Sequence, residues 1–118
     1  MDDRRKETRK KIMAFTLVYD ERGRLLGYLV NMTEQGAMVI GEKTLEINSQ
    51  VTLKIEFPDE LEGSFARKLV IAARVARCVP HEASSREFEI GFEFTKIKPE
   101  QTQIIEALLE RYHFRYQG

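Results

Sequence analysis

The chain has 118 residues, of which 42% are hydrophobic, so it suits one domain with a single core and leaves no room for a second domain of ordinary size. Its 19 basic and 19 acidic side chains balance, so no whole-molecule field draws it to nucleic acid or to an acidic membrane. No apolar run approaches the roughly 18 residues of a membrane span, which argues against membrane insertion. The single Cys78 has no partner for an internal disulfide, and the charged start does not resemble a secretory signal. We therefore expect a cytoplasmic protein.

Residues 1–11 are expected to form a flexible basic arm. They hold six basic and three acidic side chains, a net charge of +3, with almost nothing apolar to pack after Met1. Because the positive charge is local, the arm is expected to bind a small anion and to become ordered only when that ligand is present.

Residues 12–118 are expected to form one domain, and strand patterns follow one another along it. Val51–Phe57 and Phe88–Phe94 alternate apolar and polar residues with a period of two. The long run Lys68–Val79 alternates in the same way, with Arg77 as its exception. The expected strands are 12–19, 25–30, 37–40, 51–57, 68–79 and 88–94. The polar segment Asn31–Gly36 is expected at a sheet edge or turn.

One C-terminal helix is expected over residues 99–112. Pro99 suits a first helical position, and apolar residues recur at helical spacing up to Tyr112. Six strands and one helix predict an all-β fold: a small six-stranded antiparallel barrel, whose closure removes exposed strand edges, with the helix on one open side.

The sequence favours a binding module over an enzyme. His81 lies in a polar loop and His113 lies beyond the helix, and neither belongs to a motif that pairs it with a nucleophile. Metal-binding motifs are lacking, and a single cysteine in an apolar strand, such as Cys78, is typical of a core residue. No catalytic residue, metal or cofactor is predicted.

Two sets of polar residues could form a ligand site. Arg5 and Arg9 lie about 13 Å apart in an extended chain, and each guanidinium can donate two parallel hydrogen bonds to a phosphate or a guanine edge. Asn31 and Thr33 point to the same face of an extended backbone, and Gly36 permits positive φ or a close approach to a ligand. Taken separately, the two sets also suit a solvated basic tail and an ordinary turn.

Together, Arg-x-x-x-Arg at 5–9 and Asn-x-Thr-x-x-Gly at 31–36 resemble the paired RxxxR and [D/N]xSxxG signature of the PilZ domain family. The resemblance covers nearly the whole chain, including the FEIGFEF strand and the closing helix. It implies a PilZ-like split barrel that binds the bacterial messenger cyclic di-GMP.

The resemblance also implies residue roles. Arg5 and Arg9 would grip guanine bases and phosphates, Asn31 would meet a guanine edge, Thr33 would offer its hydroxyl and Gly36 would shape the turn. Arg4 is a third cation in the arm and suits a self-stacked pair of cyclic di-GMP molecules. The family usually has Ser at the position of Thr33, which keeps the hydroxyl but adds a methyl group.

The leading hypothesis is a non-enzymatic cyclic di-GMP receptor whose arm closes over the nucleotide and changes the surface shown to a protein partner in motility, adhesion or exopolysaccharide control. A PilZ-like protein-interaction module that does not bind the nucleotide is the first alternative. A small nucleic-acid-binding barrel is the second, and it is disfavoured because the aromatic residues fall mostly at core positions.

Overall fold

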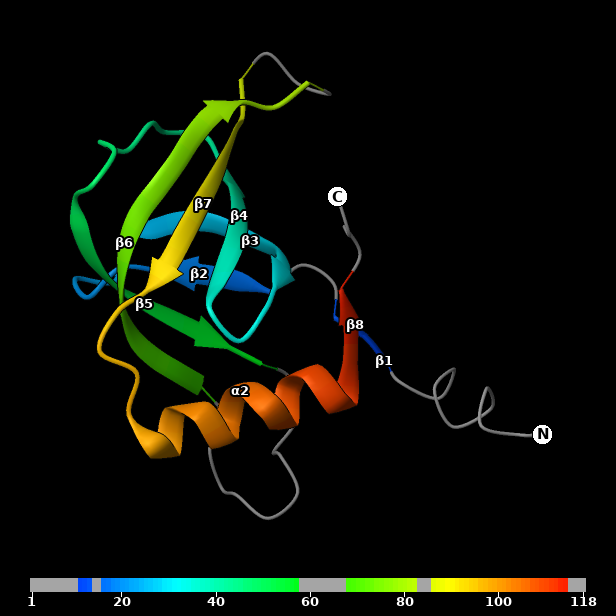
Figure 1. Cartoon of the computed structure of the whole chain (residues 1–118). Coiled ribbons are helices and arrows are strands. Elements are labelled where there is room, and N and C mark those ends of the chain that lie inside the picture. The colour runs from blue at the N-terminus through cyan, green and yellow to red at the C-terminus, as the bar shows by residue number, and fades with distance from the viewer. Residues whose placement is uncertain (1–10, 14–15, 58–67, 83–85, 115–118) are drawn as a thin grey trace.

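The computed structural model describes residues 11–13, 16–57, 68–82 and 86–114, without the side chains of 11–13, 113 and 114. Six antiparallel strands close into a barrel in the order β2-β3-β4-β7-β6-β5 (Figure 1). Their bounds are β2 Leu17–Tyr19, β3 Leu25–Met32, β4 Gly36–Gly41, β5 Gln50–Glu56, β6 Lys68–Pro80 and β7 Phe88–Phe94. The prediction of a six-stranded antiparallel barrel is therefore confirmed.

The barrel interior is filled by the apolar residues of the alternating strands. Leu53, Ile55, Ile71, Val75 and Ile90 are all at most 1% exposed, as the period-two pattern predicted. The inner residues of neighbouring strands face one another in register, for example Leu53 opposite Ile71 and Ile55 opposite Leu69. Burying side chains of this size stabilises the fold by about 1.5–3 kcal/mol each.

The helix α2 (Pro99–Arg111) lies across one end of the barrel (Figure 1). Its first residue is Pro99. The N–H of the preceding residue, Lys98, donates a hydrogen bond of 2.7 Å to the side-chain oxygen of Gln101. The Gln101 amide donates a second bond of 2.7 Å to the backbone oxygen of Val70 on β6. Because Ile105 and Leu108 belong to the core cluster, the helix closes this end of the barrel.

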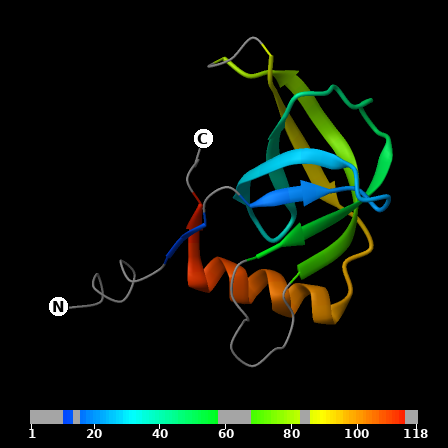
Figure 2. The ribbon, with the colours of Figure 1, turned by 180° about the vertical axis from the view of Figure 1, so that it is seen from behind.

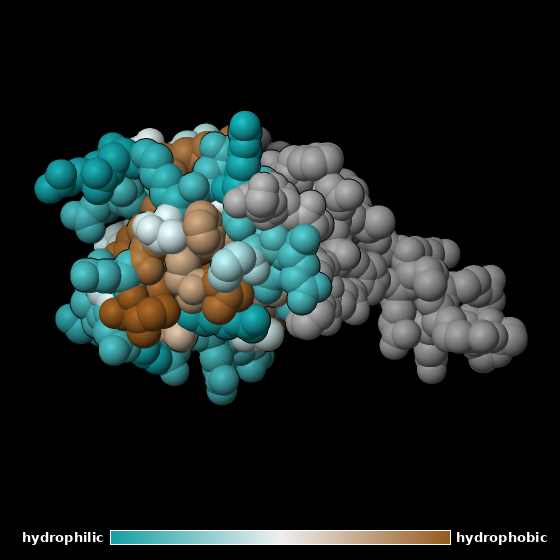
Figure 3. Space-filling view, turned by 90° about the horizontal axis from the view of Figure 1, so that it is seen from above, coloured by the Kyte–Doolittle hydropathy of each residue, from teal (hydrophilic) through white to brown (hydrophobic). Residues whose placement is uncertain are grey.

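At the opposite barrel end, apolar residues gather on the surface beside hydrophilic ones (Figure 3). No helix among the described residues is long and apolar enough to cross a membrane.

A second, smaller sheet joins the two ends of the described chain. β1 (Lys11–Met13) pairs in parallel with β8 (Tyr112–Phe114), and the two strands lie side by side next to the barrel (Figures 1 and 2). The expected first strand, 12–19, is therefore divided between two sheets. The helix ends at Arg111 rather than at residue 112, because Tyr112 begins β8. This pairing was not predicted from the sequence pattern.

Candidate functional site

A row of four residues crosses the outer face of the barrel. Asn31 on β3 lies opposite Met38 on β4, Met38 lies opposite Gly91 on β7, and Gly91 lies opposite Arg77 on β6. Residues directly opposite one another in an antiparallel ladder share a face of the sheet. The strand neighbours Met32, Val39 and Phe92 are buried, and the Arg77 side chain is 61% exposed, so the row itself faces outward.

Both ends of the row are placed by β-bulges. The register shifts between Leu29 and Asn31 on β3 and between Val75 and Arg77 on β6. Leu29 and Val75 point into the core, at 3% and 0% exposure, and strict alternation would send the residues two positions later inward as well. One extra residue before Asn31, and one before Arg77, turns the side chain of each outward. The bulges thus bring an amide and a guanidinium to the outer face.

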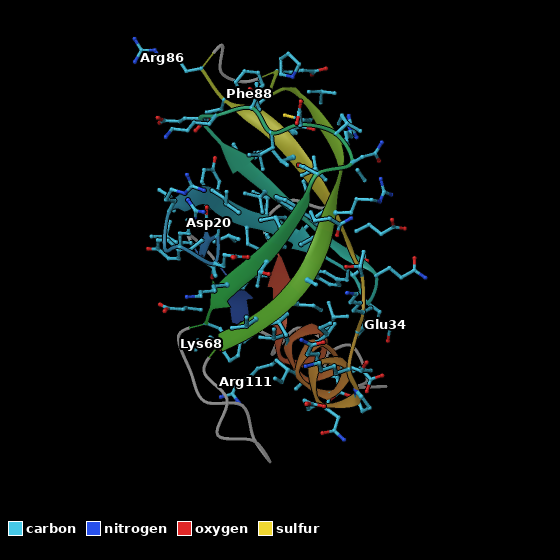
Figure 4. The ribbon with its side chains drawn as sticks, turned by 90° about the vertical axis from the view of Figure 1, so that its left-hand side faces the viewer. Asp20, Glu34, Lys68, Arg86, Phe88 and Arg111 are labelled. Atoms are coloured by element: carbon cyan, nitrogen blue, oxygen red, sulfur yellow. The ribbon has the colours of Figure 1, made fainter. Side chains whose placement is uncertain are left out.

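Asn31, Met38 and Arg77 of this row line a surface hollow of about 350 Å³. The turn after β3 carries Glu34. It lies on the side of the molecule opposite the hairpin that carries Asp20 (Figure 4). The hollow is lined by Asn31, Met32, Thr33, Gln35, Gly36, Ala37, Met38, Arg77, Phe92 and Glu93.

The turn between β3 and β4 is held by its own hydrogen bonds. The Thr33 N–H donates to the Gly36 carbonyl at 2.9 Å, and the Gln35 N–H donates to the Thr33 hydroxyl oxygen at 3.1 Å. The Phe94 N–H donates to the Gln35 carbonyl at 2.8 Å, which ties the turn to β7. Thr33 is therefore fixed in place at the rim of the hollow, although its side chain is exposed.

Gly36 is required by a close approach between strands. A Cβ atom at this position would lie 2.2 Å from the Phe92 carbonyl oxygen, far inside a normal contact. Positive φ occurs at Gly23 and Gly27 among the described glycines, and Gly36 is not one of them. Glycine was expected here for positive φ or for a close approach to a ligand. The expectation of positive φ is wrong. The close approach in the structure is to the Phe92 backbone.

Asn31 lies within β3 rather than in the turn, which corrects the expectation that the whole segment Asn31–Gly36 is a turn or an edge. Its side chain is half-buried on the outer face, where a polar group is tolerated. The Asn31 side-chain oxygen accepts a 2.9 Å hydrogen bond from the Met32 N–H. This bond fixes the amide orientation, so the NH₂ group can be presented to a ligand.

Two ion pairs set the charge around the hollow. Arg77, 61% exposed, lies 3.9 Å from the Glu89 carboxylate, which also contacts the His81 ring at 3.0 Å. On the other side, Arg74 donates to Glu93 through Nε at 3.1 Å and to the Asn48 side chain at 2.7 Å. The Glu93 carboxylate, which lines the hollow, is thereby paired with the Arg74 guanidinium. Across the described ranges, no group of three or more acidic, His or Cys side chains could hold a metal ion.

The structure brings Asn31, Thr33 and Gly36 together at one hollow. Arg4, Arg5 and Arg9 lie outside the described residues, so their roles stay predictions. Met38 and Arg77, which also line the hollow, were not predicted as candidate residues. The sequence did carry one signal, because Arg77 was the basic exception in an otherwise apolar alternation.

Comparison with known proteins agrees with this fold. The sequence model of the PilZ domain matches residues 3–112, and the chain therefore belongs to the PilZ domain family. Among solved structures, it is similar to the PilZ domain with c-di-GMP of YcgR from Escherichia coli, with a TM-score of 0.57 and 10% sequence identity. The match covers 84% of this chain and 82% of that one. No curated protein matches the chain.

Proposed function

We propose that the protein is a receptor for cyclic di-GMP. The observation that carries the proposal is the outer-face hollow that is lined by Asn31, Thr33 and Gly36 together, in a chain of the PilZ family. An amide, a hydroxyl and a nearby guanidinium match what a guanine edge and a phosphate require: paired donors and acceptors for the base, and donors for the anion. The similar YcgR domain, solved with c-di-GMP, supports the same ligand.

The arm supplies the remaining cations in this proposal. Arg5 and Arg9 precede β1 by only a few residues, and β1 is tied through β8 to the body of the domain. Closure of the arm over the nucleotide would place their guanidinium groups against bases and phosphates, with Arg4 as an additional contact to a second, stacked nucleotide. The protein acts without catalysis in the cytoplasm.

The output of binding is a changed surface for a protein partner. β1 follows the arm directly and pairs with β8, which follows α2 directly. Ordering of the arm would therefore stabilise β1, its pairing with β8 and the end of the helix. This linkage supports a partner surface near α2, in motility, adhesion or exopolysaccharide control.

Isothermal titration with cyclic di-GMP tests the proposal. We expect binding at micromolar concentration or below for the wild type, and at least about tenfold weaker binding for the Arg5→Ala, Arg9→Ala double variant, since two charge-assisted contacts are lost. GMP is the ligand control. Absence of heat and of a thermal shift with cyclic di-GMP would overturn the receptor proposal and leave the protein-interaction module.

Hydrogen exchange tests the proposed output separately. We expect cyclic di-GMP to slow exchange of the backbone amides in β8 and at the end of α2 in the wild type. In the double variant, measured at the same ligand concentration near the wild-type Kd, the effect should be much smaller, because binding is weaker. Binding without any change at β8 would rule out this route from the arm to the helix.

A further inference from the structure

We propose that Arg77 is a further ligand-binding residue, which contacts the nucleotide across Gly91 from the side opposite Asn31. This inference rests on the proposed function and adds a residue outside the paired motifs. Arg77 lines the same hollow as Asn31 and Thr33, but it comes from β6, which lies three strands away from β3 in the barrel order.

The row of residues leaves a space between the two polar ends. With strands about 4.8 Å apart, the backbones of Asn31 and Arg77 are separated by roughly 14 Å along the sheet. Gly91 has no side chain to fill this interval, and Met38 is half-buried. The floor between them can therefore accept a flat ring, with an amide at one end and a guanidinium at the other.

The contacts of Arg77 leave it able to bind a ligand. Its ion pair with Glu89, at 3.9 Å, is at the outer limit of such pairs, and its side chain is 61% exposed. The pair limits where the guanidinium can point, while its length leaves N–H groups that can donate elsewhere. Glu89 itself is only 13% exposed and is held from its other oxygen by His81.

The bulge before Arg77 is the second reason to assign it a role. Leu69, Ile71, Ala73 and Val75 all point into the core, and an arginine two positions later would be buried without the extra residue Ala76. A bulge costs ladder hydrogen bonds and is typical of positions where a side chain is redirected near a site. Here the bulge delivers a cation to the hollow.

Titration of cyclic di-GMP into four variants tests the assignment. Arg77→Ala should weaken binding about tenfold, because a charge-assisted contact in a partly enclosed site is lost. Arg77→Lys should recover only part of the affinity, since lysine keeps the charge but cannot donate a planar pair of bonds or stack on a base. Gly91→Val should weaken binding, because the added side chain would occupy the space between Asn31 and Arg77. Lys68→Ala is the matched control: it removes a cation from the same strand, at the end near the helix (Figure 4), and should bind as the wild type does.

The outcomes separate this assignment from the receptor proposal. If the wild type does not bind, both fail. If the wild type binds and Arg77→Ala binds equally well, only the assignment of Arg77 fails. Full affinity of Arg77→Lys would reduce its role to a long-range charge effect and would also overturn the proposed contact. Thermal melting of each variant identifies any loss of folding, and Arg77→Ala removes only one long ion pair.

Discussion

The backbone oxygen of Phe92 occupies the space into which any side chain at Gly36 would extend, 2.2 Å from an added Cβ. Gly36→Ala should therefore lower the free energy of unfolding by about 1–3 kcal/mol, because β4 must move away from β7. Urea unfolding measures the change.

Gly91→Ala is the matched control for this prediction. It also replaces a glycine in a paired strand, but its added Cβ would meet the Arg77 Cβ at 3.4 Å, an ordinary contact. Its stability should stay within about 1 kcal/mol of the wild type. Equal stability of the two variants would contradict the close approach at Gly36.

Thr33 is expected to act through its hydroxyl, with its methyl group tolerated. Thr33→Ser keeps the acceptor for the Gln35 N–H and should bind cyclic di-GMP at least as tightly as the wild type. Thr33→Val keeps the shape but loses the hydroxyl, so binding should weaken about tenfold. Titration of both variants decides the question. A large gain for Thr33→Ser would mean that the methyl group obstructs the ligand.

Arg74 is expected to neutralise Glu93 at the edge of the hollow. Arg74→Ala leaves the Glu93 carboxylate without this cation, and repulsion should weaken binding of an anionic nucleotide by about two- to fivefold. The Arg74→Ala, Glu93→Gln double variant removes both charges and should bind nearly as the wild type does. If the double variant is as weak as the single one, Arg74 acts by another route.

Asp20 makes stability depend on pH in the hairpin between β2 and β3. Its pKa is lowered from 3.8, first by the hydrogen bond from the Arg24 N–H, then by the Arg22 N–H and the Arg24 side chain, against an opposing effect of burial. A lowered folded-state pKa contributes stability above the unfolded-state value, and this is lost as the pH falls through the folded-state value.

Asp20→Asn should therefore melt at a lower temperature than the wild type at pH 7. The difference should shrink as the pH falls below 3.8. Thermal melts of both proteins between neutral and acidic pH measure it. A constant difference across this range would show that the Asp20 charge is not responsible.

The sequence predicted the barrel well because its strands carry strong period-two signals, as in Val51–Phe57 and Phe88–Phe94. It could not place Arg77 in the same row as Asn31, for two physical reasons. The barrel order puts β7 between β4 and β6, which alternation alone does not specify. In addition, the bulges at Val30 and Ala76 reverse the direction of the following side chains, and a bulge has no simple sequence pattern.

Other features were predictable only in part. Asn31, Thr33 and Gly36 were predicted from their spacing and do line one hollow, but Asn31 was expected outside the strands because an amide suits a turn. In the structure Asn31 lies in β3, and its amide is tolerated there because the side chain is on the outer face. The strand β8 was missed because three residues after an amphipathic helix carry too little pattern to indicate a strand.

The pairing of β1 with β8 also constrains the order in which the protein can fold. Lys11 is synthesised near the start of the chain, and its partner Tyr112 follows about a hundred residues later. At 5–20 residues per second, β1 waits for several seconds on the ribosome before β8 emerges. Contacts between such distant segments also form slowly, because a long loop must close. Until β8 has left the ribosome, β1 has no partner strand, so the small sheet beside the barrel is among the last parts of the fold to form.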